Sequence, residues 1–235
     1  MLKIEVLSDE QMNVVDRRQI QQQVDWTSIP PEGIRTRFAD VDLTLLPGVF
    51  PPKRDTQLLS ASVDLSRADS VLDVGTGSGA LAIWAARQGD ASVIAIDISD
   101  AACKNASINV EKLSLKNRIQ VRHGDIASTL RQAETFDVII ANLPGRNKKA
   151  TSTIAAAQWD TDFKAHKALF AHSKSLLRAG GKIFMVKANY PDLLEMVDIA
   201  TAFKLRTEVI GVSDATPDDP RIYYALALNK LDAAD

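Results

Sequence analysis

From residue 70 onward the sequence alternates short apolar runs with segments of helical periodicity. The runs cover residues 71–74, 92–96, 119–121, 136–140 and 182–186. Strands that are joined by helical crossovers pair in parallel, and their helices cover both faces of the sheet. Two further apolar segments, 205–210 and 222–228, are separated by the turn-rich loop SDATPDDP, which allows an antiparallel pair. The pattern predicts an α/β fold with a doubly wound, Rossmann-like, mostly parallel seven-stranded sheet and an antiparallel C-terminal strand.

The first 54 residues have a different pattern. Residues 9–26 are polar except for a thin apolar stripe, and residues 34–46 alternate imperfectly between apolar and polar side chains. These patterns predict a peripheral helix followed by a strand or hairpin. We therefore expect a small N-terminal arm, residues 1–54, ahead of a main domain, residues 55–235. The apolar stripe of the helix consists of Val14, Val15, Ile20 and Val24.

Glycine and acidic residues follow the predicted strands, where ligands bind in a sheet of this kind. The first strand leads into three alternating glycines at the start of a helix, where the backbone comes close to a ligand and free N–H groups point at it. Asp97 ends the second strand and is placed to accept hydrogen bonds from a ribose diol. Asp125 follows the third strand and can accept from an adenine amino group beside Ile126. The glycine loop consists of Gly75, Thr76, Gly77, Ser78 and Gly79.

The spacing within this loop distinguishes between classes of nucleotide cofactor. The loop reads GxGxG, whereas dinucleotide-binding folds usually show GxGxxG. Asp73 lies in the strand just before the loop, where its negative charge would repel a pyrophosphate. A cofactor with a cationic end therefore fits better. The alternative is that Asp73 only caps the glycine turn.

These motifs resemble those of the class I S-adenosylmethionine-dependent methyltransferases. The resemblance lies in VLDVGTGSG, in Asp97 and Asp125, and in the turn at residues 142–145, and it covers roughly residues 50 to 230. The segment PPKRDTQLL at residues 51–59 is similar to the one that precedes the first strand in HemK-like, release-factor glutamine N5-methyltransferases. The resemblance implies an enzyme whose cofactor is S-adenosyl-L-methionine. It implies cofactor contacts from Asp73, Gly75, Thr76, Gly77, Ser78, Gly79, Asp97, Ile98, Asp125, Ile126, Asn142 and Thr56.

The turn at residues 142–145 departs from the NPPY turn of that family. It reads Asn142, Leu143, Pro144, Gly145. The family turn orients a substrate NH2 group through the Asn side chain and the next carbonyl, and Leu143 retains such a carbonyl. Gly145, however, carries no aromatic ring to stack on a planar amide or base, which disfavours adenine as a substrate. The resemblance assigns the catalytic positions to Asn142, Leu143 and Pro144.

The resulting hypothesis is N-methylation of an amino or amide nitrogen, on a protein side chain or a small molecule. Methyl transfer from a sulfonium is a single displacement, so positioning rather than a nucleophilic side chain is required. A first alternative is O-methylation of a small carboxylate or hydroxyl compound, for which Arg146 and Lys148 would hold the anion. A second is a non-catalytic module that binds the cofactor. For Trp159 and Asp160 two interpretations stay open: they line the cleft, or they merely cap the helix that follows them. For Asp55 and Thr56 the alternatives are a place at the cofactor site or a cap for the helix that begins there.

The net charge, the apolar runs and the numbers of histidines and cysteines indicate which partners and metals to expect. The chain has 28 Lys and Arg against 30 Asp and Glu, a net charge of −2, which makes nucleic acid an unlikely partner. The N-terminus MLKIEVLSDEQ is not a targeting signal and no run is long enough to span a membrane, so we expect a cytoplasmic protein without a membrane partner. The three histidines are far apart and Cys103 is alone, so we expect no metal. The methyl acceptor and the oligomeric state stay open.

Overall fold

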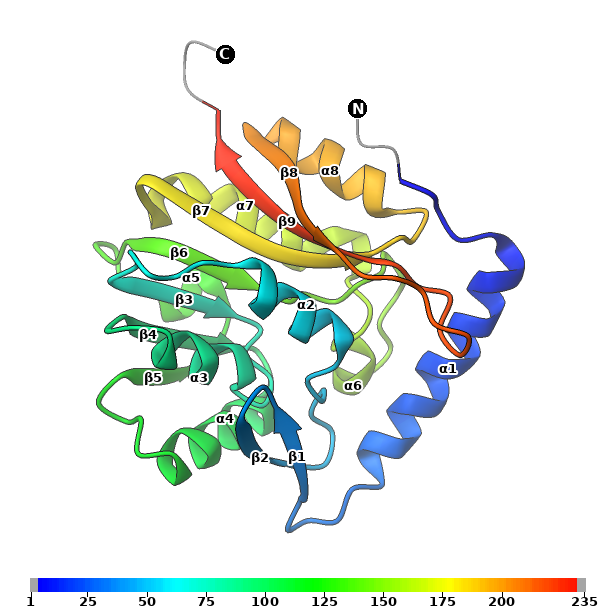
Figure 1. The fold of residues 1–235 in the computed structure, drawn as a ribbon, viewed down its shortest axis with the longest axis horizontal. Coiled ribbons are helices and arrows are strands. Elements are labelled where there is room, and N and C mark those ends of the chain that lie inside the picture. Colours follow the sequence, from blue (N-terminus) through cyan, green and yellow to red (C-terminus); the bar gives the residue numbers. More distant parts are fainter. Residues whose placement is uncertain (1–3, 232–235) are drawn as a thin grey trace.

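The computed structural model describes residues 4–231 and confirms the predicted sheet. Seven strands lie in the order β5-β4-β3-β6-β7-β9-β8 (Figure 1). The strands from β5 to β7 are parallel, and β9 is antiparallel to both of its neighbours. The strands are β3 (Ser70–Val74), β4 (Ser92–Asp97), β5 (Ile119–His123), β6 (Phe136–Ala141), β7 (Leu177–Ala188), β8 (Leu205–Val212) and β9 (Tyr223–Lys230).

Helices cover both faces of this sheet, because alternate residues of the central strands point to opposite sides. Val71 and Ile140 belong to one apolar cluster with α2 and α3, whereas Leu72 and Ile139 belong to a second cluster with α7 and α8. The two clusters are the two core layers of a doubly wound fold. The helices are α2 (Arg54–Ser62), α3 (Ala80–Arg87), α4 (Asp100–Lys112), α5 (Ile126–Thr129), α6 (Thr153–Ala156), α7 (Lys164–Leu176) and α8 (Leu193–Ala202), with a 3-10 turn at Thr161–Phe163.

The N-terminal segment forms a helix, α1 (Asp9–Thr27), and a two-stranded hairpin, β1 (Ile34–Phe38) and β2 (Val41–Leu45). Ser8 caps α1 by accepting from the backbone N–H of Gln11. The hairpin is anchored to α4, because Asn109 Oδ1 accepts from Thr44 N at 2.8 Å and Asn105 Oδ1 accepts from Leu46 N at 2.8 Å. Both elements are therefore held against the main sheet domain.

The predicted buried stripe of α1 is wrong. Of its four members only Val15 is fully buried, whereas Ile20 and Val24 are 53% and 52% exposed. The helix buries Gln19 and Trp26 instead. The physical reason is that buried Gln19 accepts a hydrogen bond from Trp159 Nε1 at 3.1 Å, so the inner face of α1 carries a hydrogen-bonding side chain as well as apolar ones.

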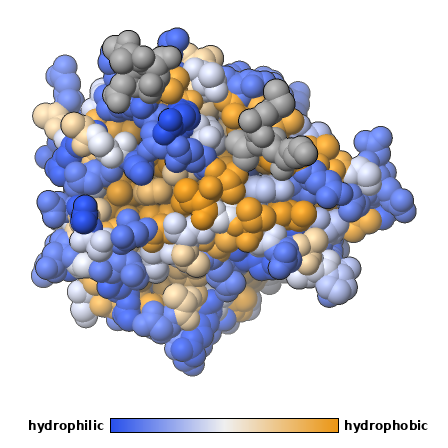
Figure 2. All heavy atoms as spheres, turned by 45° about the horizontal axis from the view of Figure 1, so that its top comes forward, coloured by the Kyte–Doolittle hydropathy of each residue, from blue (hydrophilic) through white to orange (hydrophobic). Residues whose placement is uncertain are grey.

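One edge of the sheet is β8, which pairs only with β9 among the described strands. Ile210 and Val212 on this strand are 36% and 55% exposed. Figure 2 shows that apolar side chains form a band across one face of the molecule, with hydrophilic side chains around it. Within residues 4–231, no helix has both the length and the apolar character needed to cross a membrane.

Candidate functional site

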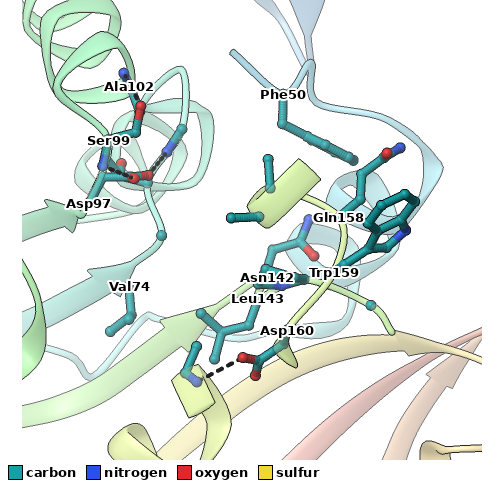
Figure 3. A pocket seen from close by; sticks show the side chains of 18 of the residues that line it. Phe50, Val74, Asp97, Ser99, Ala102, Asn142, Leu143, Gln158, Trp159 and Asp160 are labelled. Atoms are coloured by element: carbon teal, nitrogen blue, oxygen red, sulfur yellow. Dashed lines mark hydrogen bonds between the residues drawn. The ribbon is translucent and has the colours of Figure 1, made fainter. Parts of the chain in front are cut away.

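A cavity of about 450 Å³ opens at the carboxyl ends of β3, β4 and β6. Its size and its place at the ends of parallel strands are those of a cofactor site in an α/β sheet. In Figure 3, Asp97 lies on one side of the cavity, and Trp159 and Gln158 lie on the other. The lining residues come from positions as far apart in the sequence as Gln19 and Tyr223.

The glycine loop forms the floor of this cavity. Gly75, Gly77 and Gly79 all have left-handed backbone angles, with φ of 75°, 55° and 83°. Gly79 has a second reason to lack a side chain, because a Cβ there would lie 3.1 Å from Ala106 Cβ on α4. The loop thus turns sharply from β3 into α3 and presents its backbone to the cavity, together with Thr76 and Ser78.

Asp97 joins the glycine loop to the start of α4. Its Oδ2 accepts from Gly77 N at 2.9 Å, and its Oδ1 accepts from Ser99 N at 2.9 Å. Burial raises the pKa of Asp97 in spite of these backbone donors. The carboxylate also lines the cavity, and each of its oxygens can accept a further bond. This arrangement fits the two hydroxyls of a ribose.

Asp73 does not line the cavity. Its side chain lies beneath the loop, where Oδ2 accepts from Thr76 Oγ1 at 2.7 Å and the buried Oδ1 has no hydrogen-bond partner within residues 4–231. Burial raises the pKa of Asp73 to about 7. The geometry therefore favours the alternative of a brace for the glycine turn, and the electrostatic argument against a pyrophosphate loses its basis.

The three residues that were predicted to bind adenine, Ile98, Asp125 and Ile126, all line the cavity. Asp125 caps α5 through Oδ1, which accepts from Ser128 N at 2.8 Å and from Ser128 Oγ at 2.7 Å. Neither contact uses Oδ2, so that oxygen remains available toward the cavity that Asp125 lines. Ile126 is buried and Ile98 is 65% exposed, and both contribute apolar surface to the cavity.

Asn142 has a defined amide orientation. Its Nδ2 donates to Asp55 Oδ2 at 3.3 Å and to Thr56 Oγ1 at 3.2 Å. A carboxylate such as Asp55 only accepts, so the amide nitrogen must face it, and the Oδ1 atom of Asn142 is left for the cavity. The start of α2 therefore supports the turn, which is a structural role for Thr56 in addition to its place in the cavity lining.

A buried polar chain supports the same turn from behind. Lys187 Nζ, at the end of β7, donates to Pro144 O at 2.9 Å and to His166 Nε2 at 3.0 Å. His166 Nδ1 in turn donates to Asp160 Oδ2 at 2.6 Å. Burial, and then the Lys187 ammonium, lower the pKa of His166 to about 4, so the ring is neutral; burial lowers the pKa of Lys187 to about 8. This series of hydrogen-bonded side chains links α7 and β7 to the residues that follow Asn142.

Neither Lys187 nor His166 was predicted from the sequence as a residue of the site. The one available signal was a lysine directly after the apolar run 182–186, at the inner end of a buried strand. Asp160 does cap α7, since its Oδ1 accepts from Ala165 N at 2.9 Å. It also lines the cavity beside Trp159.

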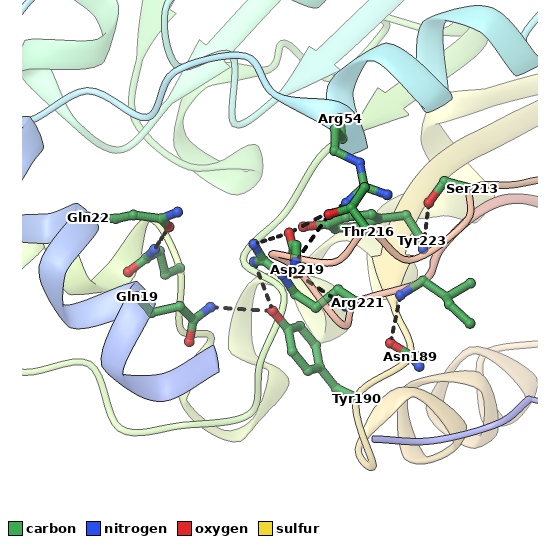
Figure 4. A network of polar contacts seen from close by, with 12 residues as sticks. Gln19, Gln22, Arg54, Asn189, Tyr190, Ser213, Thr216, Asp219, Arg221 and Tyr223 are labelled. Carbon is green, nitrogen blue, oxygen red and sulfur yellow. Dashed lines mark hydrogen bonds and ion pairs between the residues drawn. The ribbon is translucent and has the colours of Figure 1, made fainter. Parts of the chain in front are cut away.

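An aromatic ring does lie at the turn, although Gly145 has no side chain. A Cβ at Gly145 would lie 3.0 Å from Tyr190 Cε2, so Tyr190 fills the space beside the glycine. Tyr190 follows β7 and lines the cavity. Its hydroxyl accepts from Arg221 Nη1 at 3.4 Å and from Gln19 Nε2 at 3.5 Å (Figure 4). Tyr190 therefore supplies an aromatic ring beside the turn, so the missing side chain at Gly145 does not by itself disfavour a planar substrate.

Helix α1 forms one wall of the cavity through Gln19 and Gln22. Gln19 Oε1 accepts from Trp159 Nε1 at 3.1 Å, and Gln22 Oε1 accepts from Gln158 Nε2 at 3.2 Å. These contacts join the N-terminal helix to the segment between β6 and α7. The wall is polar, which explains why an apolar stripe could not identify the inner face of α1.

The same helix engages the two basic residues that were considered as an anion clamp. Arg146 Nη1 and Lys148 Nζ both pair with the carboxylate of Asp16, the latter at 3.3 Å. Arg146 also lies over the Tyr190 ring and Lys148 over the Trp159 ring, at 5.3 Å and 4.4 Å from the centroids. Neither is among the residues that line the cavity in the described part of the chain.

Comparison with known proteins agrees with this geometry. Residues 40–209 match the model of the methyltransferase small domain family. The tRNA1(Val) (adenine(37)-N6)-methyltransferase of Vibrio vulnificus strain CMCP6 is 36% identical over 136 residues, 57% of this chain and 56% of that protein. The release factor glutamine methyltransferase of Moorella thermoacetica is 32% identical over 160 residues, 61% and 56% of the two chains. The chain thus spans little more than half the length of these relatives.

Solved structures show the same fold. The Thermus thermophilus 16S rRNA N2 G1207 methyltransferase RsmC, in complex with AdoMet and guanosine, superposes with a TM-score of 0.61 at 23% identity and covers 84% of this chain and 50% of that one. The ribosomal protein L11 methylase of Lactobacillus delbrueckii subsp. bulgaricus gives a TM-score of 0.57 at 23% identity, with 78% and 82% covered.

These relatives overturn the expectation that nucleic acid is an unlikely partner, because proteins that match this chain are methyltransferases of tRNA and rRNA. That expectation rested on the net charge of the whole chain, which does not report the local charge at a binding surface. The cavity, with its glycine loop and the Asp97 carboxylate, fits S-adenosylmethionine. The chain belongs to the methyltransferase small domain family.

Proposed function

We propose that this protein is an S-adenosylmethionine-dependent methyltransferase that methylates an exocyclic amino nitrogen of a nucleobase in RNA. The observation that carries the proposal is the orientation of Asn142, whose amide nitrogen is bound by Asp55 and Thr56. Its Oδ1 and the carbonyl of Leu143 can then accept the two hydrogens of an NH2 group. This pair of acceptors would aim the nitrogen lone pair at the methyl group.

The other residues of the cavity would hold the cofactor. In this assignment the glycine loop contacts the methionine part, Asp97 binds the ribose, and Asp125 with Ile98 and Ile126 binds the adenine. When bound, S-adenosylmethionine would supply an activated methyl group to the nitrogen that Asn142 and Leu143 orient, and the surplus proton of that nitrogen would leave to water. The protein contributes orientation and exclusion of water, which is why Pro144 and its Lys187 support matter.

A planar substrate is supported by the aromatic side chains near the turn. Tyr190 lies beside Gly145, and Trp159 lines the cavity opposite Asp97 (Figure 3). The 36% identity to a tRNA adenine N6-methyltransferase favours a nucleobase over other planar groups. We further propose that residues 1–54 act as a substrate-side arm and residues 55–235 as the cofactor-binding unit, since α1 contributes Gln19 and Gln22 to the wall.

The second candidate is the side-chain amide of a protein glutamine. Its NH2 group fits the same two acceptors, and relatives that share 28% to 34% identity are release factor glutamine methyltransferases. O-methylation of an anion finds less support, because Arg146 and Lys148 are already paired with Asp16.

The test is transfer of a tritiated methyl group from S-adenosylmethionine to an extract that has been separated into RNA, protein and small molecules. We expect the label in RNA and, after nuclease digestion, in an N-methylated nucleoside. Label in protein, recovered as N-methylglutamine, would replace the first candidate by the second. Label in a methyl ester or ether would contradict both.

A further inference from the structure

A second, open groove adjoins the cavity between α1, the start of α2 and the loop that joins β8 to β9. Gln22, Lys53, Arg221 and Tyr223 line both the groove and the cavity. The groove is thus continuous with the cavity on the side of α1. A ligand could occupy both at once.

The walls of this groove carry more positive than negative charge. Four cationic side chains line it, Arg18, Lys53, Arg54 and Arg221, against Asp25 and Asp219. Asp219 is engaged, because both of its oxygens accept from Arg221 at 2.7 Å and Arg54 Nη1 lies 3.6 Å away (Figure 4).

Two of the cations have no acidic partner in the described part of the chain. Arg18, on α1, makes no ion pair within 4 Å. Lys53 Nζ also makes none, and it lies 5.1 Å from the centroid of the Trp26 ring. Burial, followed by the positive charge of Arg221, lowers the pKa of Lys53. An anion in the groove would offset the repulsion between Lys53 and Arg221.

We propose that this groove binds the phosphodiester backbone of the RNA strand whose target base enters the cavity. The proposal rests on the proposed function. A base beside Asn142 must be turned out of its stack, which brings its neighbouring phosphates to the mouth of the cavity. Arginine and lysine side chains bind such phosphates without regard to sequence, and guanidinium groups match their geometry. The groove therefore holds the strand, while the cavity selects the base.

The test measures binding of a fluorescein-labelled, single-stranded RNA of 20 nucleotides by anisotropy, with S-adenosylhomocysteine present. The double variant Arg18→Gln and Lys53→Gln removes two positive charges and keeps a polar side chain at both positions. Arg67→Gln with Lys112→Gln is the matched control, because both residues are exposed, lie outside the groove and change the net charge equally.

Each phosphate contact with a single strand contributes about 0.7 to the slope of log Kd against log salt. The groove variant should therefore lower this slope by about 1.4 and weaken binding roughly 25-fold at 0.1 M salt. The control should stay within about twofold of the unmodified protein. Equal losses in both variants, or an unchanged slope in the groove variant, would overturn the proposal.

Two further measurements separate other ligands of the same charge. A loss of S-adenosylhomocysteine affinity in the Lys53→Gln variant, with RNA affinity unchanged, would assign the ammonium to the cofactor carboxylate and overturn the proposal. Binding of a poly-glutamate peptide as tight as that of RNA would make the groove a site for acidic protein. If RNA is methylated but the groove variant keeps the salt slope of the unmodified protein, the proposed role of the groove is refuted and the proposed function stands. If the methyl label appears only in protein, the proposed function itself is refuted.

Discussion

The substitution Asp73→Asn tests whether the glycine loop rests on a buried carboxyl group. Asp73 is 1% exposed, its Oδ2 accepts from Thr76 Oγ1, and its Oδ1 has no partner in the described structure. Burial raises its pKa to about 7, and the nearby Asp97 adds to the effect. Asparagine has the same shape and can still accept from Thr76, but it cannot ionise.

The sign of the expected pH dependence follows from linkage. The pKa of Asp73 in the folded protein is above the value of about 3.9 in the unfolded chain, so the folded state prefers the protonated form. Its contribution to stability is complete below pH 3.9 and is lost as the pH rises through about 7. Between pH 5.5 and 8.5 this loss amounts to about 2 kcal/mol.

The assay is urea unfolding of both proteins at pH 5.5 and pH 8.5. The free energy of unfolding of the Asp73→Asn variant, relative to the unmodified protein, should rise by about 2 kcal/mol between the two values. His166, whose pKa is lowered to about 4, gives a pH dependence of opposite sign, but it is present in both proteins and cancels in the comparison. Parallel pH profiles would show that Asp73 is not the titrating group beneath the loop.

Three further predictions concern the cavity. Asp97→Ala should weaken binding of S-adenosylhomocysteine by roughly 10- to 100-fold in calorimetry, since a charged acceptor contributes about 1.5 to 3 kcal/mol; unchanged affinity would make Asp97 a turn residue only. Asn142→Ala should lower kcat by about 100-fold while cofactor affinity stays within about twofold. If this variant instead turns over as fast as the unmodified protein, and Arg146→Ala causes a large loss of activity, O-methylation would be favoured. Lys187→Met removes the donor that lies 2.9 Å from Pro144 O. The variant should lower the single-turnover rate by about tenfold more than it lowers cofactor affinity. Equal effects on the rate and on the affinity would assign Lys187 a structural role alone.

The sheet could be predicted because its signals are local. Each apolar run and the helix after it lie within about thirty residues, and the connection between them determines whether neighbouring strands are parallel. The loop that joins β8 and β9 is too short for a crossover, so the antiparallel pair was also predictable. The inner face of α1 was not, because it packs against residues far away in sequence and uses Gln19 where an apolar side chain was expected.

The residues of the candidate site likewise divide into those that could be predicted from the sequence and those that could not. Asp97 and the glycine loop could be recognised because strand, turn and helix are consecutive, and the structure brings them to one cavity. Tyr190 could not be recognised as the aromatic neighbour of Gly145, because their contact depends on how the end of β7 lies against β6. Lys187 was missed for the same reason. The role of this lysine can be recognised only when its hydrogen-bond acceptor, Pro144 O, is known.

The error about nucleic acid has a related cause. A net charge of −2 sums over the whole surface, whereas a strand of RNA responds to charge within about one Debye length, roughly 10 Å at 0.1 M salt. Arg18, Lys53 and Arg221 come from opposite ends of the chain, and only the packing of α1 beside the loop before β9 places them along one groove. Two of the chain's acidic residues, Asp97 and Asp125, line the cofactor end of the cavity instead. A nearly neutral chain can thus be acidic where it binds a cationic cofactor and basic where it meets its substrate.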